Sequence, residues 1–370
     1  MMSTIKKVGV FIPVYKGSDL LEELIEKLIK DTYKNKEIFI TIDKPNQKSL
    51  EIVKKYRSKV NFILNKRRTG KVNALNNAVK ISKSEILVFL DSDVKLKTLN
   101  FLSEIIQEIE EFDILDIKKE IIRESFIPKM VNYEYISFNF ANYLFSKLIK
   151  KCFSINGAAF AIKRETFEEV KGFSKVLAED SDLATKTLLK NKKFKYTERI
   201  EIYTKAPSNW RSWLIQRKRW GIGAGLWLKC HWRNLLKYAK KYPYVVIPSI
   251  LILFPTLIPI LINYILSNFL GYKIVGFIFM LLATRFNFFI PFFFSTSIAI
   301  VLITSIMNFI INFLIFSIIF YLISKKLKLY FNFLEFLIYY FFYQPLAFFT
   351  LMVGLITPFL PLKYTLDWKV

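Results

Sequence analysis

The stretch Ser84-Glu-Ile-Leu-Val-Phe-Leu-Asp-Ser-Asp-Val94 decides the fold, because an apolar strand pattern ends there in two carboxylates. A strand of this kind delivers the residues after it into the crevice where open α/β sheets bind ligands. Asp91 and Asp93 follow at that point, and carboxylate oxygens are the ligands that Mg²⁺ and Mn²⁺ prefer. An Asp-Ser-Asp sequence is also common in turns that cap the next helix, so both interpretations stay open on these residues alone.

Strands and helices alternate on the amino-terminal side of this stretch. Apolar runs predict strands at 7–14, 37–42, 60–64 and 86–90, and helical spacing predicts helices between them at 19–30, 47–56 and 72–81. This alternation predicts an α/β fold with a mostly parallel, doubly wound sheet. Asp43 and Asp91 should then lie at the carboxyl edge of the sheet, where a nucleotide would bind.

Three further segments carry polar groups that suit a nucleotide site. Asn65-Lys-Arg-Arg-Thr-Gly-Lys71 places cations before a helix start, which suits phosphate or a solvated basic loop. Asn156-Gly-Ala-Ala-Phe-Ala-Ile162 is a small-residue strand that permits close approach of a ligand. Glu179 and Asp180 open a helix, either as favourable charges in its first turn or as a general base.

The last third of the chain is far more apolar than the rest. Of 55 basic and 30 acidic residues, seven basic and two acidic ones follow position 241. Long uncharged tracts predict four membrane spans, near 244–268, 274–293, 297–323 and 335–360. Lys237, Lys240 and Lys241 precede the first span, so the positive-inside rule predicts a cytoplasmic amino-terminal domain in a multi-pass integral membrane protein. Four spans leave Lys325 on the opposite side, against that rule, so one tract can instead be re-entrant.

The cysteines, the amino-terminal segment and the net charge limit the cellular location and the partners that we expect. No cleavable signal peptide is expected, and a structural disulfide between Cys152 and Cys230 is not expected on the cytoplasmic side. The net charge of +25 comes from scattered lysines without a nucleic-acid-binding motif, so we expect membrane lipids as partners and no nucleic acid.

Five of the six tryptophans lie between Ser208 and Lys241, just before the first predicted span. Such density predicts an interfacial helix, with His231 and Cys230 as interface residues. Trp220 differs because it ends the sequence Gln216-Arg-Lys-Arg-Trp220. We therefore predict a catalytic domain at 1–207, a Trp-rich interfacial region at 208–241 and a transmembrane domain at 242–370.

Taken together, four motifs resemble those of a known enzyme family. Asp43, Asp91-Ser-Asp93, Glu179-Asp180 and Gln216-x-x-Arg219-Trp220, followed by membrane spans, resemble the inverting family 2 glycosyltransferases. The closest branch carries a Gln-x-x-Arg-Trp motif and includes cellulose, chitin and hyaluronan synthases and ceramide glucosyltransferase. The resemblance covers about residues 6–235 by motif and implies a nucleotide-diphospho-sugar transferase (GT-A-like) fold.

The resemblance also implies a role for each matching residue. Asp43 would contact the nucleotide base, Lys71 would lie by the nucleotide, and Asp91 would approach the ribose or phosphate. Asp93, with Asp91, would hold Mg²⁺ or Mn²⁺ at the diphosphate. Asp180, beside Glu179, would be the catalytic base. The remaining motif residues would form the diphosphate and acceptor end of the site: Gln216, Arg219 and, for the acceptor, Trp220.

The resemblance thus implies a membrane-bound, metal-dependent hexosyltransferase that moves a sugar from a nucleotide-diphospho-sugar to a lipid or saccharide hydroxyl. Two alternatives are a polyprenyl-phosphate (dolichyl-phosphate) sugar synthase and a processive polysaccharide synthase. No span precedes the domain and four spans are a thin frame for a polymer channel, which favours single or limited transfer. A non-catalytic membrane anchor with a decayed domain is disfavoured by the retained acidic residues.

Overall fold

The computed structural model describes residues 6–257, 259, 270–286 and 292–361. The chain divides into two compact units. One unit consists of Met1–Ser249 together with Ala347–Val370, and the other is Ile250–Leu346. The predicted nucleotide-site residues all belong to the first unit.

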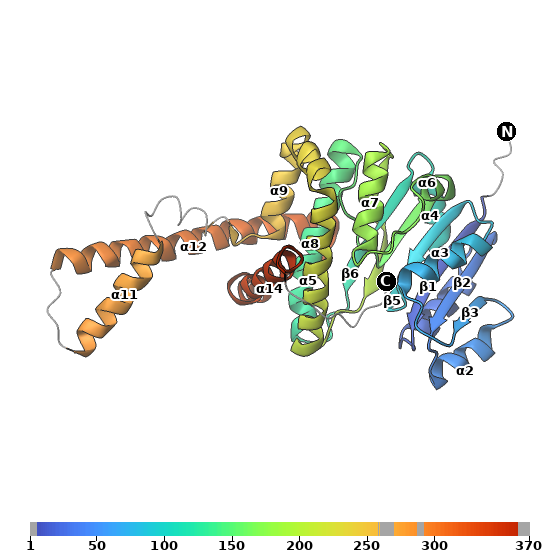
Figure 1. Cartoon of the computed structure of the whole chain (residues 1–370), viewed down its shortest axis with the longest axis horizontal. Helices are drawn as coiled ribbons and strands as arrows, with labels where there is room; N and C mark the ends of the chain where they lie inside the picture. The colour runs from blue at the N-terminus through green and yellow to red at the C-terminus, as the bar shows by residue number, and fades with distance from the viewer. Residues whose placement is uncertain (1–5, 258, 260–269, 287–291, 362–370) are drawn as a thin grey trace. The chain divides into compact units, whose positions relative to one another are not determined.

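An eight-stranded sheet with the order β3-β2-β1-β4-β7-β6-β8-β5 forms the centre of the first unit (Figure 1). The pairs β1–β2, β2–β3, β1–β4 and β6–β8 are parallel, and β4–β7, β6–β7 and β5–β8 are antiparallel. The predicted α/β class with a mostly parallel sheet is confirmed. The strands are β1 (Val8–Tyr15), β2 (Lys36–Asp43), β3 (Asn61–Asn65), β4 (Ile86–Leu90), β5 (Val94–Leu96), β6 (Ile114–Ile121), β7 (Ala159–Lys163) and β8 (Phe194–Thr204).

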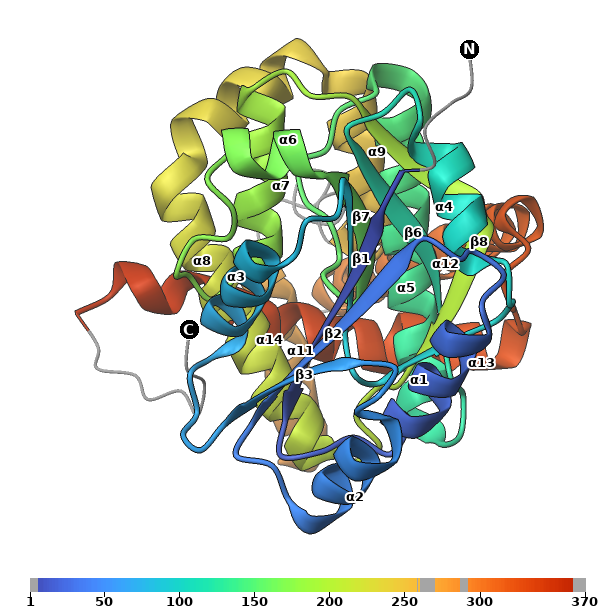
Figure 2. The same cartoon turned by 90° about the vertical axis from the view of Figure 1, so that its right-hand side faces the viewer.

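Helices cover both faces of this sheet. In Figure 2, α3 and α7 lie to the left of β1, and α1 and α4 lie to its right. The helices of this unit are α1 (Leu21–Lys30), α2 (Gln47–Tyr56), α3 (Lys71–Ile81), α4 (Phe101–Ile109), α5 (Phe126–Leu144) with the π-helical turn η1 (Phe145–Ile149), α6 (Arg164–Glu169), α7 (Glu179–Leu189), α8 (Trp210–Lys241) and the start of α9 (Pro243–Leu253).

The packing of β4 in the core explains why the two carboxylates that follow it are held firmly in place. All five residues of β4 are buried, and Phe89 packs between Phe11 and Phe160 from the neighbouring strands. Apolar side chains on both faces are expected for a central strand covered by helices on each side. The first polar side chain after this apolar strand is therefore that of Asp91, where β4 ends at the edge of the sheet.

Helix α8 packs closely against the segment 347–361 of the same unit. A Cβ added at Gly221 would lie 2.8 Å from Gly354 Cα, and one at Gly225 would lie 2.3 Å from Leu355 O. Lys229 Nζ also donates to Pro358 O at 3.4 Å. The two glycines thus permit a backbone approach that any larger residue would prevent.

The second unit is helical, and part of the predicted spans falls outside the described residues. By length and apolar composition, Ile303–Leu327 and Phe333–Phe359 suffice to cross a membrane. They overlap the predicted spans 297–323 and 335–360. The predicted spans 244–268 and 274–293 include residues 258, 260–268 and 287–291, which lie outside the described part. The helices of the second unit include α11 (Leu270–Arg285), α12 (Phe292–Leu327), α13 (Phe333–Ile338), η2 (Tyr339–Tyr343) and the start of α14 (Gln344–Ile356). The rest of α14 and η3 (Thr357–Phe359) belong to the first unit.

Candidate active site

Asp91 and Asp93 lie in the turn that joins β4 to β5. The amide of Asp91 donates to Ala158 O at 2.9 Å, which anchors this turn to the residues just before β7. The element after the turn is a strand, so the pair does not cap a helix. Both carboxylates are therefore left at the carboxyl edge of the sheet, as the sequence predicts.

Lys71 joins the acidic residues of two separate motifs. Its Nζ lies 2.8 Å from Asp91 Oδ1 and 3.2 Å from Glu179 Oε1, and its side chain is only 19% exposed. It is the first residue of α3, and Glu179 is the first residue of α7. The interpretation of this segment as a solvated basic loop holds for the exposed Lys66 and Arg67 but is wrong for Lys71.

Asp180 is fixed by the backbone of the small-residue segment before β7. The amide of Gly157 donates to Asp180 Oδ2 at 2.8 Å, and a Cβ at Gly157 would lie 2.9 Å from the same oxygen. The predicted approach of a ligand to this segment stays a prediction, whereas the side chain that lies close to its backbone is that of Asp180. Its other oxygen accepts from the Ser181 amide at 2.7 Å. Lone pairs remain on the carboxylate for a substrate hydroxyl.

These groups face a common pocket, whose empty space is about 220 Å³ when the part open to solvent is included. Its walls come from β1, α3, β4, the segment before β7, and α7. The polar side chains that line it are Lys71, Asp91, Glu179 and Asp180. Apolar contacts from Leu75, Phe89 and Phe173 surround them. The pocket thus holds one cation and three carboxylates against apolar walls. Because little water screens these charges, the interactions between them are strong.

The electrostatics of this cluster follow from its burial. Although burial alone would lower it, the pKa of Lys71 is raised by the carboxylates of Asp91, Glu179 and Asp180. Burial and the nearby Asp180 carboxylate raise the pKa of Glu179, against the effect of Lys71. Burial and the Asp91 carboxylate raise the pKa of Asp93 to about 6. Asp93 thus carries a negative charge that its surroundings compensate incompletely.

A divalent cation would relieve this charge at Asp93. Among the residues that the structure describes, no group of three or more His, Cys, Asp and Glu side chains is arranged to hold a metal. Mg²⁺ is often bound by one or two carboxylates while substrate phosphates supply further oxygens. Asp93 and Asp91 fit that kind of site, in which the donor completes the coordination.

Helix α8 brings Arg219 toward the same carboxylates. Burial lowers the pKa of Arg219, and the charges of Glu179, Asp91, Asp180 and Asp93 act in the opposite direction. The guanidinium therefore lies within the field of the acidic cluster. Two other predicted residues on α8 contact Arg217 instead. Arg217 Nη1 donates to Gln216 Oε1 at 3.5 Å, and the Trp220 ring lies against the Arg217 guanidinium.

Arg217 is a residue that the sequence interpretation did not single out. It is fully buried, it forms an ion pair with Glu134 of α5, and its guanidinium lies 4.4 Å from the centre of the Trp220 ring. The Trp213 ring lies 5.4 Å away on the other helical turn. The spacing of Trp213, Arg217 and Trp220 at i, i+4 and i+7 could have indicated this shared face. One face of Trp220 is therefore covered by a cation.

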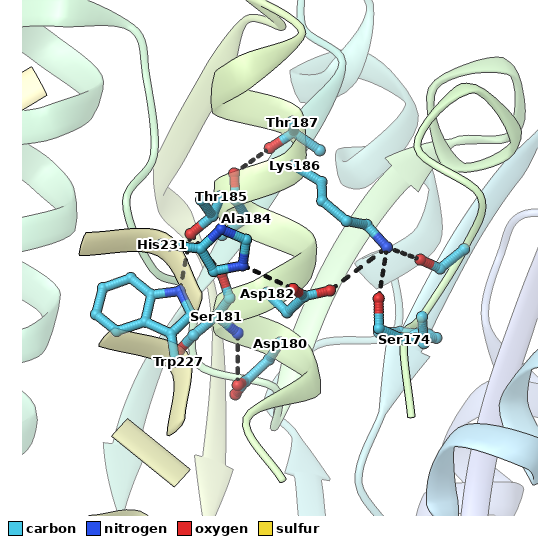
Figure 3. A network of polar contacts seen from close by, with 12 residues as sticks. Ser174, Asp180, Ser181, Asp182, Ala184, Thr185, Lys186, Thr187, Trp227 and His231 are labelled. Atoms are coloured by element: carbon cyan, nitrogen blue, oxygen red, sulfur yellow. Dashed lines mark hydrogen bonds and ion pairs between the residues drawn. The ribbon is translucent and has the colours of Figure 1, made fainter. Parts of the chain in front are cut away.

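A hydrogen-bonded network joins α7 to α8 (Figure 3). His231 Nε2 lies 2.9 Å from Asp182 Oδ1, and Trp227 Nε1 donates to Thr185 Oγ1 at 2.9 Å. Lys186 Nζ lies 3.4 Å from Asp182 Oδ2 and donates to Ser174 Oγ at 3.0 Å. The network holds the helix that begins with Glu179 and Asp180 against the helix that carries Arg219.

This network changes the interpretation of the Trp-rich region. Trp213 is fully buried in protein and Trp227 is bonded to α7, whereas Trp210 and Trp232 are exposed. His231, which was expected to be an interface residue, contacts Asp182 instead. Part of the tryptophan density therefore serves to dock α8 on the domain, because an indole can pack and donate at the same time.

Asp43 lies two strands away from Asp91, at the end of β2. Its carboxylate accepts from Asn65 Nδ2 at 2.9 Å, Thr69 Oγ1 at 2.7 Å, Thr69 N at 2.7 Å and Gly70 N at 2.9 Å. Only 5% of the residue is exposed. The structure thus connects Asp43 to the rest of the site through the loop that leads to Lys71.

Comparison with known proteins identifies the amino-terminal part of the chain. Residues 9–170 match the family model described as Glycosyl transferase family 2. The chain contains a glycosyltransferase family 2 domain. The matched range runs from β1 to α6 and includes Asp43, Lys71, Asp91 and Asp93.

Two named bacterial enzymes are similar to part of this chain. The poly(ribitol-phosphate) beta-glucosyltransferase of Bacillus spizizenii is 34% identical over 93 residues, which is 24% of this chain and 15% of that enzyme. The Escherichia coli enzyme WfaP, a UDP-Glc:alpha-D-GlcNAc-diphosphoundecaprenol beta-1,3-glucosyltransferase, is 34% identical over 87 residues, 23% of this chain and 35% of that enzyme. The aligned parts are thus well under half of either relative.

A solved structure extends the likeness beyond the family match. The mannosyltransferase PcManGT from Pyrobaculum calidifontis, in complex with GDP-Man and Mn2+, has a TM-score of 0.54 and 18% sequence identity. The alignment covers 82% of this chain and 86% of that one. It supports the predicted GT-A-like fold. The two bacterial relatives are named as glucosyltransferases and PcManGT as a mannosyltransferase.

Proposed function

We propose that the protein is a metal-dependent, membrane-bound inverting glycosyltransferase that moves a hexosyl group from a nucleoside-diphospho-sugar to a hydroxyl of a lipid or saccharide. Within family 2 we assign it to the branch with a Gln-x-x-Arg-Trp motif, on the basis of Gln216, Arg219 and Trp220. The observation that carries the proposal is the meeting of Asp91 and Glu179 at Lys71, beside Asp180 in one pocket.

This arrangement suits the displacement of a nucleoside diphosphate. The acceptor oxygen attacks the anomeric carbon, the bond to the diphosphate oxygen breaks, and the acceptor proton passes to a carboxylate. Negative charge then grows on the leaving diphosphate, which Lys71 and Arg219 would stabilise. Asp180, with lone pairs left after its bond to Gly157, would take the proton. Attack from the face opposite the leaving group inverts the anomeric centre.

Asp93 and Asp91 would hold Mg²⁺ or Mn²⁺ against the diphosphate. A bound divalent cation would supply charge neutralisation on the leaving group. The raised pKa of Asp93 supports this assignment, because burial beside Asp91 leaves a charge there for a cation to compensate. The presence of Mn2+ with GDP-Man in PcManGT is consistent with such a site.

A membrane-linked acceptor is favoured by two observations. Ile303–Leu327 and Phe333–Phe359 are long and apolar enough to cross a membrane, which supports membrane association. We place the catalytic domain in the cytoplasm by the positive-inside rule, from Lys237, Lys240 and Lys241. WfaP is named for an acceptor sugar attached to diphosphoundecaprenol, which is a lipid diphosphate. Trp220, with one ring face covered by Arg217, would offer its remaining surface to the acceptor.

The substitution Asp180→Asn tests the proposal directly. An amide oxygen can still accept from Gly157 but cannot take the acceptor proton, so we expect transfer to fall by roughly 10²- to 10⁴-fold. Binding of the donor nucleotide with Mn²⁺ should change little, since Asp180 does not face the diphosphate in this assignment. Glu179→Gln is the matched control for the second carboxylate. Full activity of Asp180→Asn would remove Asp180 as the base.

Product analysis separates the alternatives within this class. Purified membranes given a panel of nucleotide sugars should yield one mass increment per extracted acceptor if transfer is single, and a ladder if the enzyme polymerises. A protein that charges polyprenyl phosphate and no hydroxyl acceptor would instead be a polyprenyl-phosphate sugar synthase.

A further inference from the structure

Each residue of the Asp91-Ser-Asp93 turn is tied by a hydrogen bond to a different segment of the chain. The amide of the first residue donates to Ala158 O at 2.9 Å, just before β7. The carbonyl of the last residue accepts from the Lys205 amide at 3.3 Å, just after β8. Between them, the Ser18 hydroxyl donates to Ser92 O at 2.7 Å. The backbone between the two carboxylates is therefore held at three points, and the middle bond is made by a side chain.

Ser18 lies in the short segment between β1 and α1, and its hydroxyl is directed away from the helix. A serine just before a helix commonly caps the first turn with its side-chain oxygen. The N-cap of α1 is instead Leu20, whose apolar side chain cannot cap. The Ser18 hydroxyl bonds to Ser92, 74 positions further along the chain. It thus connects the loop after β1 to the turn after β4.

The loop that carries Ser18 is itself fixed by neighbouring backbone and side chains. Lys16 has a φ of 64°, a conformation that a residue with a side chain keeps only where its surroundings hold it. The Lys16 carbonyl accepts from the Asn46 amide at 3.2 Å and from the Ser49 hydroxyl. Ser18 therefore starts from a fixed backbone, so its hydroxyl can restrain Ser92 rather than follow it.

We propose that Ser18 is a positioning residue for the divalent metal, because its bond to Ser92 O sets how the Asp91 and Asp93 carboxylates are presented. The inference rests on the proposed function, since it takes these two carboxylates as the metal ligands. Each residue of a turn has two soft backbone dihedrals, so an untethered turn would let the carboxylates move independently. Mg²⁺ requires a near-ideal arrangement of its oxygen ligands. Groups that orient the ligands without touching the metal typically account for roughly 10- to 100-fold in metal affinity.

Metal titrations of the full-length protein in detergent test this role. Ser18→Ala removes the hydroxyl and leaves both carboxylates in place. We therefore expect the Kd for Mn²⁺, measured with UDP and with GDP present, to rise by roughly tenfold or more. Ser18→Thr keeps the donor and should stay within about threefold of the unchanged protein. An unchanged Kd in Ser18→Ala, or an equal loss in Ser18→Thr, would overturn the proposal.

A matched serine elsewhere separates positioning from a general loss of stability. Ser103 of α4 also donates its hydroxyl to a backbone oxygen, that of Asn100, at 2.9 Å. Ser103→Ala therefore deletes the same kind of bond outside the site and should leave the Kd for Mn²⁺ unchanged. Thermal unfolding of both alanine variants measures what each bond contributes to stability. A rise in Kd that is equal in the two variants would contradict a specific role for Ser18.

Hydrogen exchange without metal or nucleotide separates this inference from the proposed function. Ser18→Ala should speed amide exchange several-fold in a peptide covering 91–96 and leave a peptide from β2 unchanged. If the unchanged protein bound no Mn²⁺ with either nucleotide, the metal-dependent function would fail. The exchange measurement would still decide whether Ser18 holds the turn. Unaltered exchange at 91–96 would overturn the positioning role.

Discussion

At the scale of single residues, the absence of a side chain at Gly157 determines how Asp180 is held. The Gly157 amide reaches Asp180 Oδ2 at 2.8 Å, and no Cβ fits between them. The bond both orients the carboxylate and uses part of its acceptor capacity. A residue with no chemistry of its own thereby controls the direction of the proposed base.

Gly157→Ala should separate chemistry from donor binding. The added Cβ would lie 2.9 Å from Asp180 Oδ2, so the carboxylate must shift. Because small misplacements of reacting groups are costly, we expect transfer to fall by roughly 100-fold. Titration with nucleoside diphosphate and Mn²⁺ should give a Kd that stays close to the unchanged value. Normal turnover in the Gly157→Ala enzyme would show that this contact does not orient the base.

The raised pKa of Asp93 predicts how the affinity for a divalent metal depends on pH. Burial and Asp91 raise the pKa of Asp93 to about 6 in the metal-free protein, and a divalent cation binds the ionised form. Protons therefore compete with the metal below about pH 6, where affinity should fall by up to tenfold per pH unit. Above that pH the dependence from this group should level off. Mn²⁺ titrations across this pH range, on both sides of the pKa, measure it.

The control for this profile is Asp93→Asn, which should bind the metal weakly and lose the inflection near the pKa of Asp93. The same inflection in the variant would assign the titration to another group.

At the scale of elements, the placement of three helices relative to one another builds the site. Lys71 begins α3, Glu179 and Asp180 begin α7, and Arg219 lies in the third turn of α8. Asn76 of α3 exchanges two hydrogen bonds with Phe173, which precedes Ser174 and its contact with Lys186 of α7. Asp182 and His231 then connect α7 to α8. The contacts form one continuous polar network across these helices.

A double-mutant cycle measures the α7–α8 connection. His231→Ala and Asp182→Asn each remove one partner of a contact between largely buried side chains, so their effects on unfolding should be non-additive by about 1 kcal/mol. Transfer should fall in each single variant because α7 carries the proposed base. Cys230→Ser, an exposed change beside His231, should leave stability and transfer unchanged. Strictly additive losses of stability would mean that the pair is not coupled.

The bounds of the amino-terminal elements could be predicted because their signals are local. The predicted strand 86–90 and helix 47–56 coincide with β4 and α2, since apolar runs and helical spacing are set by neighbouring residues. The insertion of β7 between β4 and β6, antiparallel to both, could not be predicted in this way. Strand order depends on contacts between distant segments, which leave no periodic trace in the sequence.

The same distinction applies to the site. Asp91 and Glu179 could be singled out from the motifs, but their meeting at Lys71 depends on how α3 and α7 pack on the sheet. The four bonds of Asp43 and the contact between Asp182 and His231 were not predicted. Residue type showed that these groups are polar, but their partners lie 22–49 positions away in the chain.

At the scale of the whole molecule, the two cysteines report on the predicted orientation in the membrane. Cys230 is exposed on α8, and Cys152 is 1% exposed within the domain. If the domain is cytoplasmic, a membrane-impermeant maleimide should label Cys230 in inside-out vesicles and not in intact cells. Cys152 should react only after unfolding, and Cys230→Ser identifies the labelled band. Labelling in intact cells would reverse the orientation.

The unit that contains the site is assembled from two separate stretches of chain, and this affects the order of folding during synthesis. Gly221 and Gly225 of α8 pack against Gly354 and Leu355, which leave the ribosome after the entire 250–346 unit. Domains generally fold as they emerge, beginning at the amino terminus. Here the sheet can form early, but the helix that carries Arg219 gains its last neighbour only when the apolar helices have been made. The complete site should therefore form late, after the 250–346 unit has been synthesised.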